Sequence, residues 1–187
     1  FRDQAKKWAQ GTHWQKLNLG LRFLNFTPLS EDEDIFLQGI RKPQPLIKMQ
    51  AAEGLVKISS ISGIKDIIDL AGSDIGYTGF AYLDVLIHAD LEVYQIVLNH
   101  YKNSSHSHFR HTCLKILQNK ISENILSEIE RDLQSENQNL VVAAVSTMGQ
   151  IPTQESLFRL QQLLHHPEET IRVEAIKSIS QIGDKGS

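Results

Sequence analysis

The chain of 187 residues is long enough for one sizeable domain or for one array of small repeats. Its formal net charge of −3 and pI near 6.2 argue against a nucleic-acid partner, because binding a phosphate backbone needs an excess of Lys and Arg. No run reaches the roughly 18 to 20 apolar residues that span a bilayer, and the single cysteine excludes an internal disulfide.

The chain begins with a basic stretch. Residues 1–26 carry five Lys or Arg residues, and Asp3 is their only acidic companion. Such a start is compatible with a cytoplasmic segment next to a membrane, although a solvated helix face is the simpler interpretation. Because the first residue is Phe1 rather than Met, we expect an excised piece, and any targeting signal or membrane segment lies outside it.

A period of 31 residues runs through the chain, and we name one position in it the reference position. The residues one and four places after this position are apolar in every copy, whereas those two and six places after it are polar, with Phe26 as the exception. These two groups lie on opposite sides of a helix, so each copy contains an amphipathic helix. The reference residues are Gly20, Ala51, Tyr82, Cys113, Ala144 and Ala175, small except for Tyr82.

A second apolar series, half a period upstream, predicts a partner helix in each copy. Its members are Phe36, Ile67, Leu98, Ile129 and Leu160. The same spacing places Ala5 and Ala9 in a first partner helix over residues 2–10. Several copies carry residues typical of helix starts, namely Ser30 with Glu33, Ser122 with Glu123, and Thr153 after Pro152. Turns rich in Pro, Gly, Ser, Asn and Asp separate the helices, and strand-like alternation is absent.

The predicted fold is therefore all-α, an α-solenoid of about six antiparallel helical hairpins, since six periods of 31 residues account for almost the whole chain. We expect one domain over residues 1–187, with hairpins at approximately 1–28, 29–60, 61–90, 91–121, 122–152 and 153–187. One hairpin cannot bury its own apolar face, so stacking on its neighbours has to supply the core.

Two segments carry a resemblance to a known family: "KPQPLIKMQAAEGLVKIS" (42–59) and "HPEETIRVEAIKSISQIG" (166–183). Each begins with a turn that contains Pro or acidic residues. An apolar residue, a basic residue and two small residues follow in this order, and then Leu or Ile. They resemble the short HEAT repeats of bacterial proteins, including the HEAT-like repeats of phycobilisome lyases. Lys48, Arg110 and Arg172 match the basic position, from which Leu17, Gly79 and Val141 depart.

The resemblance covers nearly the whole chain and is strongest in the second, fifth and sixth copies. It implies an α-solenoid used for protein recognition, in some bacterial members behind an amino-terminal membrane segment. It brings no catalytic residue with it. Lyase-type members attach a tetrapyrrole to a thiol of another protein, and this sequence holds no tetrapyrrole-specific motif.

The segment "HYKNSSHSHFRH" (100–111) holds four of the eight histidines. His106, His108 and His111 are a weak candidate zinc site, because two histidines three apart on a helix plus one in a turn can supply three nitrogen ligands. Apolar residues stand at the position of His111 in other copies, which favours packing against neighbouring helices instead. We predict no metal and no cofactor.

Two further features have a structural interpretation beside a functional one. "EDED" (31–34) could bind a divalent cation, but it follows Ser30 at a helix start, where the helix dipole favours acidic residues. Trp8 and Trp14 bracket the first hairpin's turn. They either cap the exposed end of the array, the preferred interpretation, or form a hydrophobic contact for a partner.

Enzyme motifs are missing from the sequence: there is no glycine-rich phosphate loop, HExxH or CxxC. Cys113 with His111 could form a nucleophile and base. However, Cys113 takes a position that alanine fills in three other copies, so we expect a packed core residue. The chain is predicted not to be an enzyme.

The favoured function is a non-catalytic scaffold or adaptor that binds a protein along its inner helices, the second helix of each hairpin, which line the concave side of such solenoids. The polar side of these helices forms a predicted partner-binding ridge of mixed charge. The ridge residues are Arg22, Glu53, Lys57, Asp84, His88, Lys115, Asn119, Ser146, Gln150, Lys177 and Gln181.

The competing hypothesis is a chromophore-lyase-like or zinc-binding enzyme subunit. A nucleic-acid-binding solenoid ranks third, because the ridge lysines are offset by Glu53 and Asp84. We expect a monomer in the cytoplasm with a protein partner of unknown identity. A tether to the inner face of a membrane, upstream of Phe1, is a further expectation that the family resemblance raises.

Overall fold

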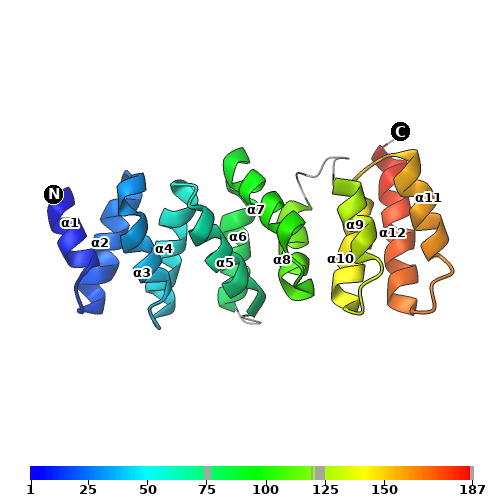
Figure 1. Ribbon diagram of the computed structural model, residues 1–187. Helices are drawn as coiled ribbons and strands as arrows, with labels where there is room; N and C mark the ends of the chain where they lie inside the picture. Colours follow the sequence, from blue (N-terminus) through cyan, green and yellow to red (C-terminus); the bar gives the residue numbers. More distant parts are fainter. Residues whose placement is uncertain (74–76, 119, 121–124, 186–187) are drawn as a thin grey trace. The chain divides into compact units, whose positions relative to one another are not determined.

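The structure is a computed structural model that describes residues 1–73, 77–118, 120 and 125–185 (Figure 1). Within these residues every regular element is helical, which confirms the predicted all-α fold. The outer helices, the first of each pair, are α1 (Arg2–Ala9), α3 (Glu33–Ile40, after the short 3-10 turn η1, Ser30–Asp32), α5 (Ile61–Ser73), α7 (Leu91–Asn103), α9 (Leu126–Asp132) and α11 (Gln154–Leu163). The inner helices are α2 (Trp14–Phe26), α4 (Pro45–Lys57), α6 (Tyr77–Ile87), α8 (Ser107–Leu117), α10 (Gln138–Met148) and α12 (Glu169–Lys185).

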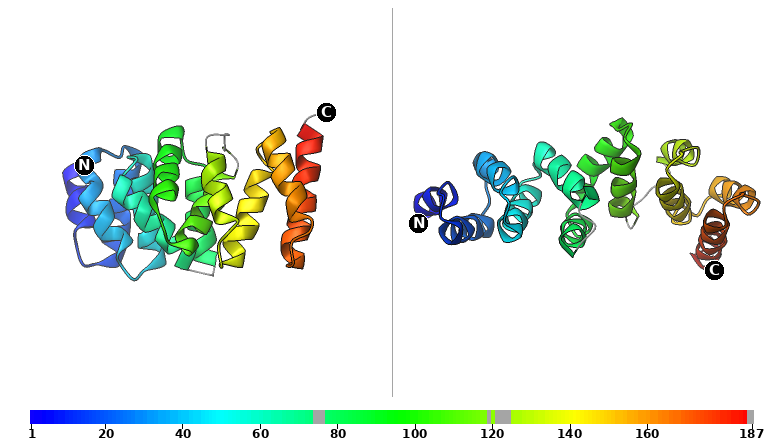
Figure 2. Two further views of the ribbon diagram at one scale, coloured as in Figure 1. Left: turned by 45° about the vertical axis from the view of Figure 1, so that its right-hand side comes forward. Right: turned by 90° about the horizontal axis from the view of Figure 1, so that it is seen from below.

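The chain divides into two compact units, residues 1–97 and 98–187, and each is described by itself. In the first unit α1 packs on α2, α3 on α4 and α5 on α6, and the inner helices pack in succession, α2 on α4 and α4 on α6 (Figure 2). In the second unit α9 packs on α10 and α11 on α12, while α10 lies between α8 and α12. That the whole chain forms one domain over 1–187 stays a prediction.

The core of both units consists of the periodic apolar positions. All six reference residues are buried, Tyr82 included, and so are all five members of the partner-helix series. Among the residues directly after the reference position, Ile176 is 58% exposed and Leu83 is half-buried, whereas the other four are buried. The burial of small residues on one helix face lets neighbouring helices approach closely.

Two helix backbones approach closely between α1 and α2, at Gly20. A Cβ atom added there would lie 2.5 Å from the backbone nitrogen of Ala9 and 2.6 Å from the carbonyl oxygen of Ala5. A comparable contact joins α10 and α12, where a Cβ on Gly149 would meet the Cβ of Ser178 at 2.6 Å. Because backbone atoms cannot move aside as a side chain can, the α1–α2 hairpin requires glycine at position 20.

Two of the predicted helix-start signals lie in described residues. One prediction is confirmed and the other is wrong. Thr153 caps α11 as expected, since its hydroxyl accepts a hydrogen bond from the Ser156 amide at 3.1 Å. The prediction for Ser30 and Glu33 was wrong: Asp32 Oδ2 accepts from the Leu29 amide at 3.1 Å instead, and Ser30 opens a 3-10 turn. A carboxylate makes the stronger, charge-assisted bond to an amide. The signal at residues 122 and 123 lies outside the described residues.

A buried ion pair joins the hairpins of the second unit. Arg110 of α8 donates from Nε to Asp132 Oδ1 at 2.7 Å, and Tyr101 Oη donates to Asp132 Oδ2 at 2.7 Å. Arg110 Nη1 also donates to the Tyr101 carbonyl at 2.6 Å. Burial, followed by the hydrogen bond to Asp132, raises the pKa of Tyr101. The three side chains therefore form a satisfied polar network inside an apolar core.

The basic position noted in the sequence has a structural role in both hairpins where it is Arg. Arg172 Nη1 donates to the carbonyls of His166 and Pro167 at 2.8 and 2.7 Å, and Arg110 Nη1 donates to the carbonyl of Ser104 in the turn before α8 at 3.4 Å. Each arginine thus ties an inner helix to the turn that precedes it. Hydrogen bonds of this kind satisfy carbonyls that a helix end leaves without partners.

Gly20→Ala tests the close approach of α1 and α2. We expect it to destabilise the first hairpin by about 1 to 3 kcal/mol, because the new methyl group overlaps backbone atoms of α1. Gly183→Ala is the matched control: nothing lies within 4 Å of its added Cβ, so the change should be neutral or stabilising by up to about 1 kcal/mol. Hydrogen exchange of the α1 and α2 amides together with thermal unfolding measures both, and equal effects would contradict the packing.

Asp132→Ala tests the buried ion pair. It leaves the Arg110 guanidinium charged and unpaired in the core, which should cost about 3 to 5 kcal/mol of unfolding free energy. The control is Glu130→Ala, which removes the partly exposed pair with Arg159 (2.6 Å) and should cost about 0 to 1 kcal/mol. Chemical unfolding followed by circular dichroism compares the two, and a small loss for Asp132→Ala would show that the network contributes little.

Candidate functional site

The predicted ridge residues lie on the inner helices or directly after them, with exposed or half-buried side chains. In the first unit these are Arg22, Glu53, Lys57, Asp84 and His88, and in the second unit Lys115, Ser146, Gln150, Lys177 and Gln181. Asn119 lies outside the described residues. The helix faces opposite to them hold the buried periodic residues, so these polar side chains are available for contact. That they bind a partner stays a prediction.

Hydrogen bonds join the polar edges of successive inner helices in the first unit. Lys57 Nζ donates to the Asn25 carbonyl at 2.9 Å, and Asn25 Nδ2 donates to the Gln50 carbonyl at 2.7 Å. Asp84 and His88 approach to 3.2 Å on the exposed side of α6. These contacts restrict the side chains of α2 and α4 before any partner arrives.

The second unit has a corresponding link between α10 and α12. Gln150 Nε2 donates to Gln181 Oε1 at 3.1 Å, so two ridge residues one repeat apart contact each other directly. Below them, the hydroxyl of Ser178 donates to the Val145 carbonyl at 3.1 Å. Lys177 approaches Glu174 of its own helix to 3.4 Å. The ridge is thus a surface of neighbouring polar groups within each unit.

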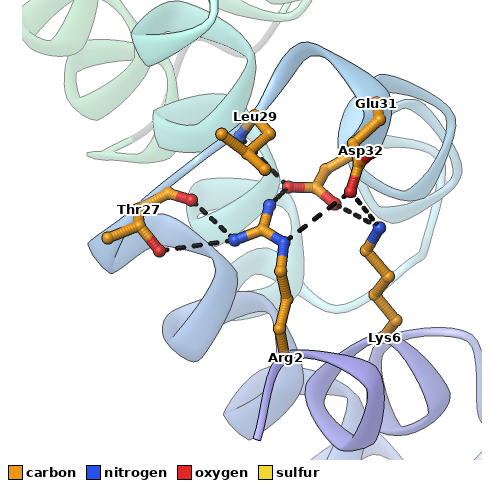
Figure 3. A network of polar contacts seen from close by, with 6 residues as sticks. All are labelled: Arg2, Lys6, Thr27, Leu29, Glu31 and Asp32. Carbon is orange, nitrogen blue, oxygen red and sulfur yellow. Dashed lines mark hydrogen bonds and ion pairs between the residues drawn. The ribbon is translucent and has the colours of Figure 1, made fainter.

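A polar network at the start of the chain gives "EDED" its role (Figure 3). The buried carboxylate of Asp32 lies between Arg2 and Lys6 of α1, and Lys6 Nζ also donates to Glu31 Oε1 at 2.6 Å. The Lys6 hydrogen bond holds the pKa of Glu31 below its ordinary value. Arg2 Nη1 donates further to the Thr27 carbonyl at 2.8 Å. These acidic residues therefore join two hairpins.

Aromatic side chains gather on the first hairpin. Trp8 is half-buried, and its ring centroid lies 6.3 Å from that of Phe23, which lies 6.4 Å from that of Phe26. Trp14 stands apart and is exposed. An open hollow of about 300 Å³ lies beside the cluster, lined by Phe1, Arg2, Ala5, Phe23, Leu24, Phe26 and Thr27.

Trp8 and Trp14 are predicted from the sequence as candidates, whereas Phe23 and Phe26 are not. A signal was present, because Phe26 is the one apolar residue in an otherwise polar series. In the structure this irregularity of the repeat is a surface feature, because Phe26 is 77% exposed. Whether Trp8 and Trp14 cap the array or contact a partner stays a prediction.

The histidines of the weak zinc candidate do not converge. His106 precedes α8 and is exposed, as is His108, whereas His111 is half-buried, and the ring centroids of His108 and His111 lie 6.4 Å apart. Across residues 1–73, 77–118, 120 and 125–185, no group of three or more His, Cys, Asp or Glu side chains could hold a metal ion. Burial first, then Lys115 and His108, lowers the pKa of His111 to about 4.

Cys113 is fully buried on α8. Its thiol therefore offers no surface on which a substrate could reach a nucleophile, and it fills the core position that alanine fills in neighbouring hairpins. In the part of the chain that the structure describes, no helix is long and apolar enough to cross a bilayer.

Paired helices whose inner members pack in succession define an all-α repeat fold of the HEAT and armadillo solenoid class. No protein-family model and no curated protein matches the chain. Among solved structures, the chain is similar to Mini spindles TOG3 of Drosophila melanogaster, with a TM-score of 0.67 and 10% identity over 96% of this chain and 93% of that one. This similarity supports the fold class.

A second solved structure is that of a HEAT-like repeats protein from the archaeon Thermococcus onnurineus NA1. It has a TM-score of 0.49 and 13% identity over 100% of this chain and 88% of that one. A set of computationally designed armadillo repeat proteins for modular peptide recognition gives a TM-score of 0.46 and 12% identity, over 97% of this chain and 99% of that one.

His111 should make the second unit sensitive to acid. Its pKa is lowered to about 4 in the folded chain, and an unfolded histidine titrates near 6.5, so the unfolded state binds more protons between these values. Stability is therefore present in full above about pH 6.5 and is lost as the pH falls toward 4. Urea unfolding at pH 7 and pH 5 should show a smaller acid-induced loss in His111→Gln than in the original chain.

The control for this measurement is His106→Gln, because His106 is exposed. We expect it to leave the difference between pH 7 and pH 5 unchanged. An equal reduction in both variants would contradict a special role of the His111 environment.

Proposed function

We propose that the chain is a non-catalytic scaffold that holds a protein partner along the polar side of its inner helices. The observation that carries the proposal is the recurrence of exposed or half-buried polar side chains on successive inner helices whose opposite faces are buried. A repeat fold extends such a surface by one helix for each hairpin, so that it can follow an elongated partner.

The charges of the ridge in the first unit favour a protein over a polyanion. In the first unit Arg22 and Lys57 stand beside Glu53 and Asp84, so cations and anions are equal in number. A nucleic acid would require a stripe of cations that neutralises successive phosphates. Mixed charges instead give specificity, because a partner has to present the complementary pattern.

The contacts between neighbouring ridge residues support binding by a prepared surface. Lys57 is held by the Asn25 carbonyl, and Gln150 by Gln181. Side chains that are already restricted lose less conformational entropy when a partner docks. The partner therefore meets a polar surface whose geometry is largely set.

The competing enzyme hypothesis gains no support from the site. Cys113 is buried, and the three histidines do not form a common ligand set. A cytoplasmic location, a bacterial origin, a monomeric state and a membrane tether upstream of Phe1 stay predictions that accompany the proposal.

Reversing three ridge charges tests the proposal. The variant Glu53→Lys, Asp84→Lys, Lys115→Glu should reduce partner capture in source cells at least about tenfold, because like charges then face each other. Its helix content and melting temperature should stay unchanged, since the side chains are not buried. Affinity purification with quantitative mass spectrometry measures the capture.

The matched control reverses the same three signs on outer helices, in exposed residues, as Asp34→Lys, Glu155→Lys and Arg131→Glu. It should leave capture intact. Unchanged capture by the ridge variant, or an equal loss in the control, would reject the ridge as the contact surface.

A further inference from the structure

The first inner helix carries three exposed apolar side chains in a row on one side. Leu19, Phe23 and Phe26, at spacings of four and three residues, lie along one side of α2 and are 41%, 39% and 77% exposed. We call these three residues the α2 patch. Phe26 stands at the ridge position where later copies have Lys57, His88, Asn119, Gln150 and Gln181. Exposed apolar side chains grouped in this way are typical of interaction sites.

The patch borders the open hollow between α1 and α2. Phe23 and Phe26 line it from α2, Ala5 and Leu24 contribute apolar surface, and Arg2 and Thr27 are its polar lining residues. Its volume of about 300 Å³ is at the low end for ligand sites. A hollow of this size suits one or two inserted apolar side chains rather than a large cofactor.

The charge of this hairpin that is not neutralised by ion pairs is positive. Arg2 and Lys6 are neutralised by Asp32 and Glu31 (Figure 3). Asp3 is the single acidic residue of the hairpin itself. Within this hairpin, the exposed Lys and Arg side chains without an ion pair to a described residue are Lys7, Lys16 and Arg22. Of these, Arg22 lies one helical turn from Phe26 on the same side of α2.

We propose that the α2 patch and the adjoining hollow dock an acidic peptide segment of a protein partner, which inserts an aromatic or aliphatic side chain into the hollow. The inference rests on the proposed scaffold function and adds the chemistry of the partner and the hairpin that holds it. Inserted aromatic residues in well-packed hollows dominate the energetics of many protein interfaces. Arg22 and the neighbouring lysines attract the acidic residues that flank the inserted side chain.

The concave shape of the hollow favours a peptide over a lipid bilayer or a second copy of this chain. A lipid bilayer would contact the protruding rings and the lysines but would leave the hollow empty of a specific group. A second copy of this chain would have to present an apolar side chain among acidic residues, although the net charge of both copies is −3. A bilayer and a second copy are therefore outcomes that the experiment has to separate.

The probe is a fluorescein-labelled synthetic peptide with a central Phe-Leu pair flanked on both sides by Asp and Glu. Fluorescence anisotropy with the full chain measures its binding. Two matched peptides serve as comparison: one has Ser in place of Phe and Leu, and the other has Asn and Gln in place of Asp and Glu. We expect each to bind at least about tenfold more weakly than the parent peptide.

Two variants of the chain locate the site. Phe26→Ser and Arg22→Glu should each weaken binding of the parent peptide at least about tenfold. Phe26 is mostly exposed, so its replacement leaves the fold intact, which circular dichroism checks. The matched controls are Phe158→Ser, an exposed phenylalanine on α11, and Arg131→Glu, an exposed cation on α9. Both controls should bind the peptide as the original chain does.

Several outcomes would overturn the inference. Equal binding of the three peptides, or unchanged binding by Phe26→Ser, would do so directly. Binding to vesicles of phosphatidylserine and phosphatidylcholine that Phe26→Ser abolishes, without peptide binding, would assign the patch to a bilayer. Self-association in sedimentation experiments that Phe26→Ser abolishes, without peptide binding, would assign it to a second copy.

The ridge variant separates this inference from the proposed function. If the triple charge reversal leaves capture unchanged while Phe26→Ser abolishes peptide binding, the ridge fails and the α2 patch stands. If the triple reversal abolishes capture while the parent peptide does not bind, the ridge stands and the patch fails.

Discussion

The structure depends on one constraint: the apolar face of a helical hairpin has to be covered by the hairpins beside it. Ala51, Ala144 and Ala175 are fully buried where inner helices meet, and Gly20 lets α2 approach the backbone of α1. Burial of this one face determines the 31-residue spacing of the apolar positions. It also leaves the opposite side of every inner helix in contact with water, so the same constraint that forms the core creates the surface on which a partner can dock.

The helical fold could be predicted from the sequence because burial is periodic, and periodicity can be read without knowing what a residue contacts. The polar networks could not be predicted in this way. Arg110 pairs with Asp132, 22 residues away, and Arg2 pairs with Asp32, 30 residues away. Neither of these separations in sequence follows from the 3.6-residue period of a helix. The cap assigned to Ser30 failed for this reason, since the partners of Asp32 on α1 place its carboxylate where it can also accept from Leu29.

The exposed positions of the candidate ridge could likewise be predicted. They lie on the opposite side of the same helices from the buried periodic positions. The apolar residue at position 26 of the α2 patch can be read from the sequence as well, but the contact of this patch with Trp8 cannot, since it joins two helices. Phe23 follows Arg22 in the sequence with no sign that it reaches Trp8, and only the structure places these rings 6.3 Å apart. The ridge and the patch meet on α2, so one inner helix combines polar and apolar contacts. A partner that uses both would have its orientation set at the α1–α2 hairpin.

Several links between hairpins span nearly one repeat in sequence. Lys57 reaches back 32 residues to Asn25, Ser178 reaches back 33 to Val145, and Tyr101 reaches forward 31 to Asp132. Each therefore closes a loop of about one repeat, and the entropy lost in closing it is nearly the same from one hairpin to the next. Folding consequently needs no early meeting of distant segments, so it can start at any hairpin and extend to its neighbours in either direction.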